Sequence, residues 1–250
     1  MDKLAKIKSI RNKLINNIPS VGSWLQIPHP TIAEIFGKNN YDWIGVDLEH
    51  GSISINDLPD IFRAIELGGT LPLVRLSSDN HELGKKVLDA GAAGVIVPMV
   101  TSEKDIKDLI ESLSWPPNGT RGVGYSRANL FGREFDNYNE FAQNPLVIAQ
   151  IEHINAIRKL DKIISVNGLD AVFLGPYDLS ASLGCVEKFY NSEYLRYTDK
   201  IMNAIPKHQL GIHIPKDVAE HYPKNRDYGF VALGMDTTMI IQNCKELYSV

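Results

Sequence analysis

Two carboxylates follow two apolar runs of the chain, and a helical run separates them. The segment 146–152 reads LVIAQIE and ends on Glu152, whereas 170–175 reads DAVFLG and is followed by Asp178. Between them, residues 154–164 repeat isoleucine and leucine at spacings of three and four, which indicates one face of a helix. Such a strand–helix–strand unit joins parallel strands. The two carboxylates are therefore expected at the same edge of one sheet, on strands roughly 4.8 Å apart.

Carboxylates at that separation repel each other unless a positive charge lies between them. Oxygen ligands suit Mg²⁺ or Mn²⁺, so Glu152 and Asp178 are predicted metal ligands, with Co²⁺ and Zn²⁺ as further choices. The same two residues could instead be helix N-caps, and Asp178 ahead of LSASLG fits that reading. The pair alone does not choose between the two.

The rest of the chain alternates apolar runs with amphipathic ones. The predicted strands are 21–27, 43–49, 71–76, 93–100, 146–152, 170–175, 210–214 and 230–234. The predicted helices are 4–15, 31–36, 56–67, 81–90, 103–113, 154–164, 194–205, 217–222 and 238–248. Near-continuous hydrophobic strands are typical of buried parallel sheets. Eight such units in 250 residues predict a TIM (β/α)₈ barrel forming one domain over 1–250, with a doubly wound open sheet as the alternative.

The composition limits the classes of partner that the protein is expected to bind. The net charge is −4 and no basic run exists, which argues against nucleic acid and anionic membrane surfaces. No apolar run approaches the roughly 20 residues of a membrane span. Cys185 and Cys244 form neither a metal spacing nor a disulfide framework, so a cytoplasmic location is expected. The irregular segment 115–144 is long enough to predict a functional loop.

Active sites of such barrels lie at the C-terminal ends of the strands, and five strand ends here carry groups that packing does not need. They are Trp24 and Gln26, then Asp47, Glu49 and His50, then Arg75, then Gln150 and Glu152, and Asp178 beyond the sixth strand. A lone histidine is usually structural, but burying this many charges costs several kcal/mol each unless they are paired or bind a ligand. The concentration therefore favours a catalytic site.

The residue types indicate the chemistry. An α-keto acid could chelate a cation through two oxygens, and the cation and Arg75 would stabilise the enolate that forms when a C–C bond breaks. His50 would transfer a proton. A Schiff-base aldolase would need a lysine inside the barrel, and no predicted strand contains one, because Lys216 lies beyond the seventh.

At this point the chain resembles the HpcH/HpaI aldolases, which are class II pyruvate aldolases. The matching segments are GSWLQ, YDWIGVDLEHG, PLVRL, VLDAGAAGVIVPMV, GTRGVGYSRA, QIEHINAI, GLDAVFLGPYDLSASLG and FVALGMDTT, in that order along nearly the whole chain. The resemblance implies cleavage or formation of a 2-keto-3-deoxy or 4-hydroxy-2-oxo acid, with pyruvate and an aldehyde as the small-molecule partners. It also implies a homo-oligomer, a trimer or hexamer, in which the last helix is often exchanged between subunits.

The resemblance assigns the catalytic roles residue by residue. It implies Glu152 and Asp178 as metal ligands, His50 as the acid/base and Arg75 as the enolate-stabilising group. It implies that Asp89 works with the histidine, although a charge on a helix surface is an equal alternative for Asp89.

The remaining matched positions are substrate-binding. Gln150 would line the pyruvate site, the backbone around Gly175, Pro176 and Tyr177 would hold the pyruvate carboxylate, and Trp24 would form a pocket wall or belong to the core. Ser126 and Arg127 fall where the family contacts substrates, with an exposed loop arginine as the alternative. Tyr177 stands where small residues are common and would narrow the pocket.

Two other functions fit the same barrel. A lyase acting on a CoA thioester or a phosphoenolpyruvate-like substrate would need a basic groove, and the predicted strand-end loops contain no cluster of lysine and arginine. A non-catalytic barrel would be favoured by the loss of one of the four central groups, and all four are present.

Overall fold

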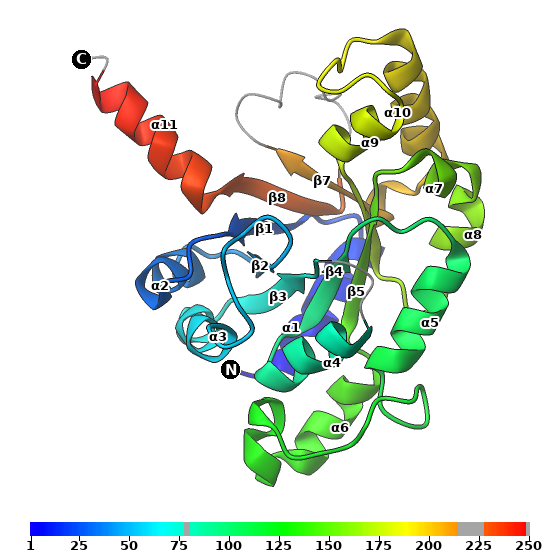
Figure 1. Ribbon diagram of the computed structural model, residues 1–250. Helices are drawn as coiled ribbons and strands as arrows, with labels where there is room; N and C mark the ends of the chain where they lie inside the picture. The colour runs from blue at the N-terminus through cyan, green and yellow to red at the C-terminus, as the bar shows by residue number, and fades with distance from the viewer. Residues whose placement is uncertain (78–80, 215–227, 249–250) are drawn as a thin grey trace.

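The computed structural model describes residues 1–77, 81–214 and 228–248, which form a parallel barrel surrounded by helices (Figure 1). The strands are β1 (Ser20–Leu25), β2 (Trp43–Asp47), β3 (Leu71–Arg75), β4 (Gly94–Val97), β5 (Leu146–Ile151), β6 (Ala171–Leu174), β7 (Leu210–Ile214) and β8 (Phe230–Met235). They pair in chain order, and β8 pairs with β1 to close the barrel. The predicted TIM-type barrel is confirmed, and its closure rules out the open sheet.

Most of the predicted helices are present near their expected bounds. The helices are α1 (Lys3–Ile15), α2 (Pro30–Gly37), α3 (Leu58–Leu67), α4 (His81–Ala90), α5 (Glu103–Leu113), η1 (Arg127–Gly132), α6 (Phe135–Gln143), α7 (Ile154–Arg158), α8 (Leu160–Ile164), α9 (Pro176–Ser182), α10 (Ser192–Ala204), η2 (Lys207–Gln209) and α11 (Asp236–Tyr248). Of these, η1, α6, α9 and η2 were not predicted. The predicted helix 154–164 is divided at Lys159, whose φ of −116° and ψ of 16° are not helical. The predicted helix 217–222 lies outside the described residues.

The segment 115–144 differs from the prediction of an irregular loop, because it contains η1 and α6. On α6, Tyr138, Phe141 and Ala142 are buried at spacings of three and four, so this short helix has an apolar face. The polar composition of the segment concealed that periodicity. Much of the expected loop is therefore a packed element beside α1 at the N-terminal end of the barrel (Figure 1).

The interior of the barrel is filled by aromatic rings. Trp43 stacks on Phe230 at 4.3 Å between ring centroids, and Trp24 makes edge contacts with Trp43 and Phe173. A Cβ at Gly22 would lie 2.2 Å from the Trp43 ring, so the interior needs glycine at that position. The apolar face of α1 belongs to the same inner cluster and closes the N-terminal end of the barrel. Side chains of opposite parity pack outward against the helices.

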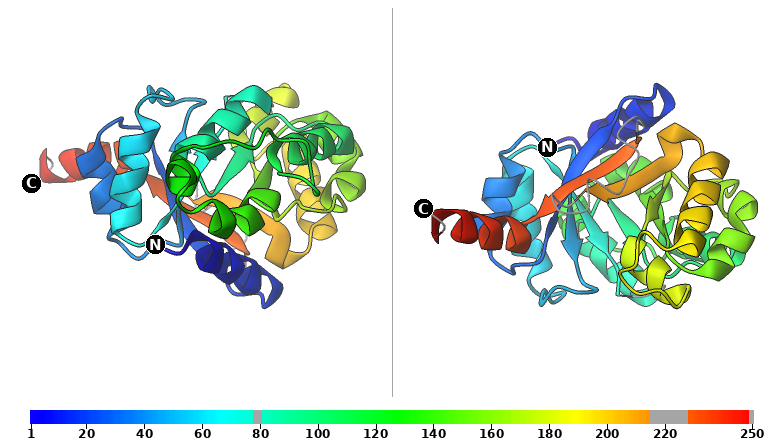
Figure 2. Two further views of the ribbon diagram at one scale, coloured as in Figure 1. Left: turned by 90° about the horizontal axis from the view of Figure 1, so that it is seen from below. Right: turned by 90° about the horizontal axis from the view of Figure 1, so that it is seen from above.

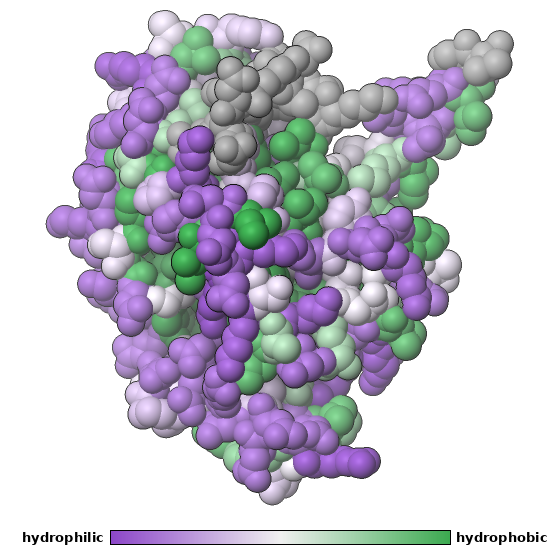
Figure 3. Space-filling model, turned by 180° about the vertical axis from the view of Figure 1, so that it is seen from behind, coloured by the Kyte–Doolittle hydropathy of each residue, from purple (hydrophilic) through white to green (hydrophobic). Residues whose placement is uncertain are grey.

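The last helix, α11, extends away from the barrel in every ribbon view (Figures 1 and 2). Only its first residue, Asp236, is buried among the described residues of the helix. Ile240, Ile241 and Leu247 are exposed apolar side chains on it. Seen from behind, the surface of the body is mostly hydrophilic, and the projecting arm carries both kinds of side chain (Figure 3). None of the described helices has the length and apolar character that crossing a membrane requires.

Candidate active site

A two-point ion pair joins neighbouring strand ends at the barrel mouth. Asp47 and Arg75 are register partners on β2 and β3, and both face the interior. Arg75 Nε donates to Asp47 Oδ1 at 2.9 Å, and Arg75 Nη2 donates to Asp47 Oδ2 at 2.7 Å. The guanidinium carbon also lies 4.7 Å from the centroid of the Trp24 ring. The plane of the guanidinium is therefore fixed by a carboxylate and an indole together.

Asp47 is fully buried and accepts further hydrogen bonds. Gln26 Nε2 donates to it at 2.8 Å, and the backbone N–H groups of Glu49 and His50 donate at 3.0 and 3.3 Å. Burial alone would raise the pKa of Asp47. The hydrogen bonds and the charge of Arg75 outweigh that effect, together with the hydrogen bonds from Gln26 and the His50 backbone, and lower the pKa. These contacts favour the anionic form of Asp47, which orients Arg75.

His50 and Glu49 form the outer part of the same strand end. The His50 side chain is 59% exposed, and its Nε2 lies 3.9 Å from Glu49 Oε2. Glu49 Oε2 also lies 3.3 Å from Arg75 Nε. Burial raises the pKa of Glu49, the Arg75 charge opposes that effect, and the charges of Asp47 and Asp178 add to it. The imidazole thus stands at the solvent-facing edge of the site, beside a carboxylate.

Glu152 is buried at the end of β5 and is held by two donors. The backbone N–H of Met99 donates to Oε1 at 2.6 Å, and Gln150 Nε2 donates to Oε2 at 2.7 Å. Met99 has a φ of +54°, a conformation that L residues rarely adopt, which aims its N–H at the carboxylate. Burial raises the pKa of Glu152 to about 7, the Met99 and Gln150 bonds oppose that rise, and the charges of Glu49 and Asp178 add to it.

Glu152 and Asp178 fit the ligand set of a divalent cation. They follow the adjacent strands β5 and β6, and their like charges are close enough to interact. Gln150 Oε1 is a buried oxygen without a hydrogen-bond partner among the described residues. Within the described ranges no group of three or more His, Cys, Asp and Glu side chains is arranged for a metal. A cation held between these two carboxylates would need further oxygen ligands, which water or substrate can supply.

A model of the HpcH/HpaI aldolase/citrate lyase family matches residues 20–243. The chain belongs to this family. It is 30% identical over 248 residues to a hydroxypyruvate/pyruvate aldolase of Roseobacter denitrificans, covering 97% of this chain and 96% of that one. It is 34% identical over 237 residues to a 2-keto-3-deoxy-L-rhamnonate aldolase of Klebsiella pneumoniae, covering 92% and 87%.

A solved structure agrees with this assignment. The crystal structure of an HpcH/HpaI aldolase/citrate lyase family protein from Burkholderia cenocepacia has a TM-score of 0.89 and 26% identity, and it covers 96% of this chain and 98% of that one. The family expected from the sequence motifs is confirmed. This HpcH/HpaI chain is accordingly an aldolase- or lyase-type enzyme acting on C–C bonds.

Not every predicted residue of this HpcH/HpaI chain lies at the mouth. Asp89 is on the last turn of α4, at the N-terminal end of the barrel, where Arg121 Nη2 donates to it at 2.6 Å. Ser126 and Arg127 begin η1 at that same end, and Arg127 is bonded to Glu66 at 2.9 Å. The structure therefore does not bring these three residues to His50 within one chain.

The predicted pocket residues around β6 lie beside the mouth. Gly175 is the N-cap of α9, and a Cβ there would lie 2.3 Å from Glu152 Oε2. Pro176 is the first residue of α9 and is buried. Tyr177 is half-exposed, and its ring makes an edge contact with Phe189 at 5.3 Å. Trp24 is buried beneath Arg75, so it is a floor of the site as well as part of the core.

Several side chains at the mouth had no role assigned from sequence. Asp47, Glu49 and Gln26 were recognised only as strand-end polar groups, although their bonds to one another and to Arg75 organise the site. His213 on β7 was not recognised, although its alternation with outward-facing Ile212 was a usable signal. The Met99 N–H leaves no signal in the sequence, because it depends on backbone conformation.

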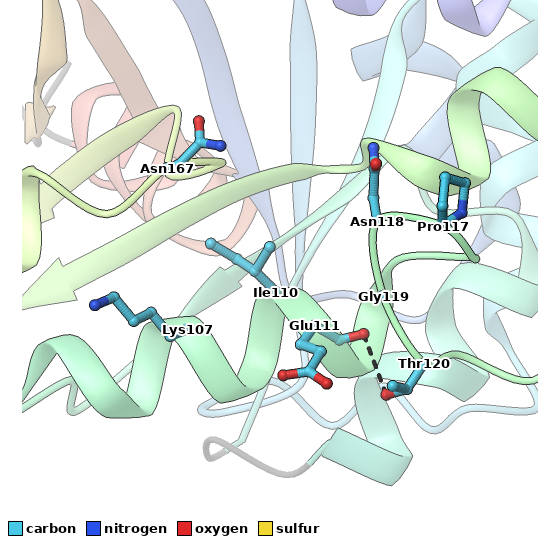
Figure 4. Close-up of a pocket in the computed structure, with 8 residues that line it drawn as sticks. All are labelled: Lys107, Ile110, Glu111, Pro117, Asn118, Gly119, Thr120 and Asn167. Atoms are coloured by element: carbon cyan, nitrogen blue, oxygen red, sulfur yellow. Dashed lines mark hydrogen bonds between the residues drawn. The ribbon is translucent and has the colours of Figure 1, made fainter.

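Away from the barrel mouth, a hollow of about 330 Å³ lies between α5 and the segment after it (Figure 4). Its lining includes Glu111, Thr120 and Asn167, and Thr120 Oγ1 donates to the Glu111 carbonyl oxygen at 3.4 Å. The Lys107 ammonium points away from that pair in this view. The hollow contains neither the carboxylate pair nor the arginine of the mouth.

Proposed function

We propose that this protein is a divalent-metal-dependent aldolase that cleaves or forms a C–C bond between a pyruvate unit and an aldehyde. The observation that carries the proposal is the arrangement of charges at one barrel mouth. Glu152 and Asp178 supply two oxygen-ligand carboxylates, and the Glu152 charge acts on Arg75, which Asp47 holds in place. The two relatives described above are both named as aldolases, which supports this reaction class.

Glu152 and Asp178 would hold the cation, and Gln150 would line the keto acid site beside them. A bound cation supplies Lewis-acid polarisation of the keto acid. Mg²⁺ and Mn²⁺ are the proposed ions, since the donors are oxygen atoms. The first turn of α9, from Gly175 through Tyr177, would present backbone to the substrate carboxylate.

Arg75 is the proposed charge-stabilising group. Asp47 occupies one edge of the guanidinium, and an arginine has five N–H donors, so donors remain for a substrate oxygen. Because Asp47 and Trp24 fix its plane before substrate arrives, Arg75 does not need to reorganise as negative charge develops. That preorganisation is the usual source of large rate effects.

His50 is the proposed proton-transfer group. In the synthetic direction the neutral imidazole would take a proton from the pyruvate methyl carbon, that carbon would bond to the aldehyde carbon, and the imidazolium would deliver the proton to the aldehyde oxygen. The partly exposed imidazole at the rim can also exchange that proton with solvent. In the cleavage direction the same imidazole takes the proton back.

Asp89, Ser126 and Arg127 are proposed to serve the site of a neighbouring copy rather than their own. They lie at the N-terminal end of the barrel, whereas His50 follows the C-terminal end of β2. The projecting α11, with its exposed apolar side chains, supports a homo-oligomer, proposed here as a trimer or hexamer. An exchanged last helix would cover those side chains.

Proton exchange into pyruvate tests the proposed function. The protein is incubated with pyruvate and Mn²⁺ in D₂O, and the methyl protons are followed by NMR. We expect deuterium uptake that EDTA abolishes and that added Mn²⁺ restores. An absence of deuterium uptake into the pyruvate methyl group in the presence of each of Mg²⁺, Mn²⁺, Co²⁺ and Zn²⁺ would refute the proposal.

A further inference from the structure

The first turn of the projecting helix α11 is fastened to the chain just beyond the end of β1. The carboxylate of Asp236 accepts from the backbone N–H of Gln26, at 3.0 Å to each oxygen, and from the backbone N–H of Ile27 at 2.8 Å. Asp236 is buried although it begins a helix that is otherwise exposed or half-buried. The helix therefore leaves the barrel from a fixed point beside the mouth (Figure 1).

The side chain of Gln26 extends this attachment into the site. Thr237 Oγ1 donates to Gln26 Oε1 at 3.1 Å, and Gln26 Nε2 donates to Asp47 Oδ2 at 2.8 Å. An ionised carboxylate can only accept hydrogen bonds, so the NH₂ end of the amide must face Asp47 and its oxygen must face Thr237. The orientation of the Gln26 amide is thus set from both sides.

The same carboxylate oxygen leads on to the arginine of the site. Arg75 Nη2 donates to Asp47 Oδ2 at 2.7 Å, so the Gln26 amide and the guanidinium share this acceptor. The complete chain of hydrogen bonds is Thr237, Gln26, Asp47 and Arg75, from α11, the end of β1, β2 and β3. β1, β2 and β3 are consecutive neighbours in the barrel, so the chain crosses the mouth without a gap. Low exposure of Asp47 limits competition from water.

We propose that Gln26 is a positioning residue that makes the orientation of Arg75 depend on the attachment of α11. This inference rests on the proposed aldolase function, in which Arg75 stabilises the enolate. Without the amide, Asp47 would lose a hydrogen bond and would hold the guanidinium in a less defined direction. A guanidinium that is displaced from the developing oxyanion stabilises it less. Gln26 would therefore affect the rate and not the affinity for the cation.

The test removes one link of the chain at a time. Deuterium exchange into pyruvate is measured at saturating pyruvate and Mn²⁺ for Gln26→Met, Thr237→Val and Thr237→Ser. Thr238→Val is the matched control, because Thr238 Oγ1 donates to the Met235 carbonyl oxygen at 3.0 Å instead of to Gln26. We expect exchange to slow at least about tenfold in Gln26→Met, which loses a bond to a charged group, and about threefold in Thr237→Val, which loses a neutral one. Thr237→Ser and Thr238→Val should exchange at the normal rate.

A double-mutant cycle separates positioning from a general structural effect. If Gln26 acts through Arg75, adding Gln26→Met to Arg75→Ala should slow exchange no further than Arg75→Ala does alone. Mn²⁺ affinity, measured by isothermal titration, should be unchanged in Gln26→Met. The same tenfold loss in the Arg75→Ala background, or a normal rate in folded Gln26→Met, would overturn the role of Gln26.

The threonine variants test the dependence on α11. A normal rate in Thr237→Val would overturn that dependence, and so would a slow rate in Thr237→Ser or Thr238→Val. If Gln26→Met does not fold, Thr237→Val takes its place in the cycle with Arg75→Ala. Each of these contrary outcomes leaves the aldolase proposal standing. An absence of exchange in the unsubstituted protein would instead overturn the proposed function, and the role of Gln26 with it.

Discussion

The two ends of the barrel use charged residues in different ways. At the mouth, the carboxylates of Asp47, Glu49 and Glu152 act on one guanidinium, that of Arg75, and the charge of Asp178 acts on Glu49 and Glu152. At the N-terminal end, Lys3 and Arg127 both bond to Glu66, and Arg121 bonds to Asp89. At the mouth these carboxylates outnumber the positive side chain. At the N-terminal end the three positive side chains outnumber the two carboxylates. The excess of negative charge at the mouth is what a divalent cation would neutralise.

The same contrast appears in the pKa values. Burial raises the pKa of Glu152 to about 7, and neighbouring carboxylates add to that rise. At the other end, burial lowers the pKa of Lys3, while the charge of Glu66 and its hydrogen bond oppose the change. A carboxyl with a raised pKa and carboxylate neighbours is what the proposed cation site requires, whereas Lys3 is paired with Glu66. Substitutions at the two ends should therefore behave differently.

The largest effect is expected for Glu152→Gln. The amide keeps the shape but removes the negative charge, so Mn²⁺ affinity should fall at least ~100-fold and exchange into pyruvate should stop. Isothermal titration with Mn²⁺ measures the first effect, and NMR measures the second. Glu66→Gln removes a carboxylate from the N-terminal end and should leave Mn²⁺ affinity unchanged. Normal Mn²⁺ binding by Glu152→Gln would remove Glu152 from the site.

Arg75→Ala and His50→Ala should each slow retro-aldol turnover by at least ~100-fold, the usual scale for losing a charge-stabilising or proton-transfer group. Mn²⁺ binding should persist in both, because neither is a proposed ligand. Turnover is followed by pyruvate release, with exposed Arg63→Ala as the control. A near-normal rate in either variant would refute the role given to that residue.

The two ends could also cooperate between copies, which mixing experiments can show. His50→Ala and Asp89→Ala should each be slow alone. If Asp89 serves a neighbour's His50, then random mixing of the two variants should restore roughly a quarter of the sites. Activity is measured after the subunits are unfolded and refolded together, with each variant treated alone as the control. If a mixed oligomer is demonstrated and activity does not recover, the role of Asp89 is limited to its ion pair with Arg121.

The most gradual effect is the pH dependence. Because Glu152 must lose its proton to bind a cation, Mn²⁺ affinity should rise up to tenfold per pH unit and level off above about 7. In metal-free protein the raised pKa stabilises the fold fully below the ordinary value of 4.5, and that contribution is lost as pH rises through about 7. The difference is roughly 3 kcal/mol in the free energy of unfolding. Denaturant titrations of the metal-free protein across this pH range should show the fall in the free energy of unfolding. The Glu152→Gln variant should not show it.

Much of the architecture followed from the sequence because eight apolar runs alternate with amphipathic ones, and strand bounds such as 210–214 match. The placement of Glu152 and Asp178 just beyond the ends of adjacent strands was also predictable, since a crossover unit places both at one edge. The place of Asp89 was predictable as well, because the last turn of a helix that joins two parallel strands lies at the N-terminal end of the barrel. The Met99 N–H depends on a left-handed backbone, and α6 was concealed by its polar composition.

The register match of Asp47 with Arg75 has a consequence for how this enzyme can change over time. The backbone hydrogen bonds that join β2 to β3 set the relative positions of Asp47 and Arg75, so one inserted residue in either strand would turn one of these side chains to the outside of the barrel. Insertions are tolerable only in the connecting segments. New substrate preferences can therefore arise by substitutions in the loops and at single inward-facing positions, while the register of β2 and β3 stays the same.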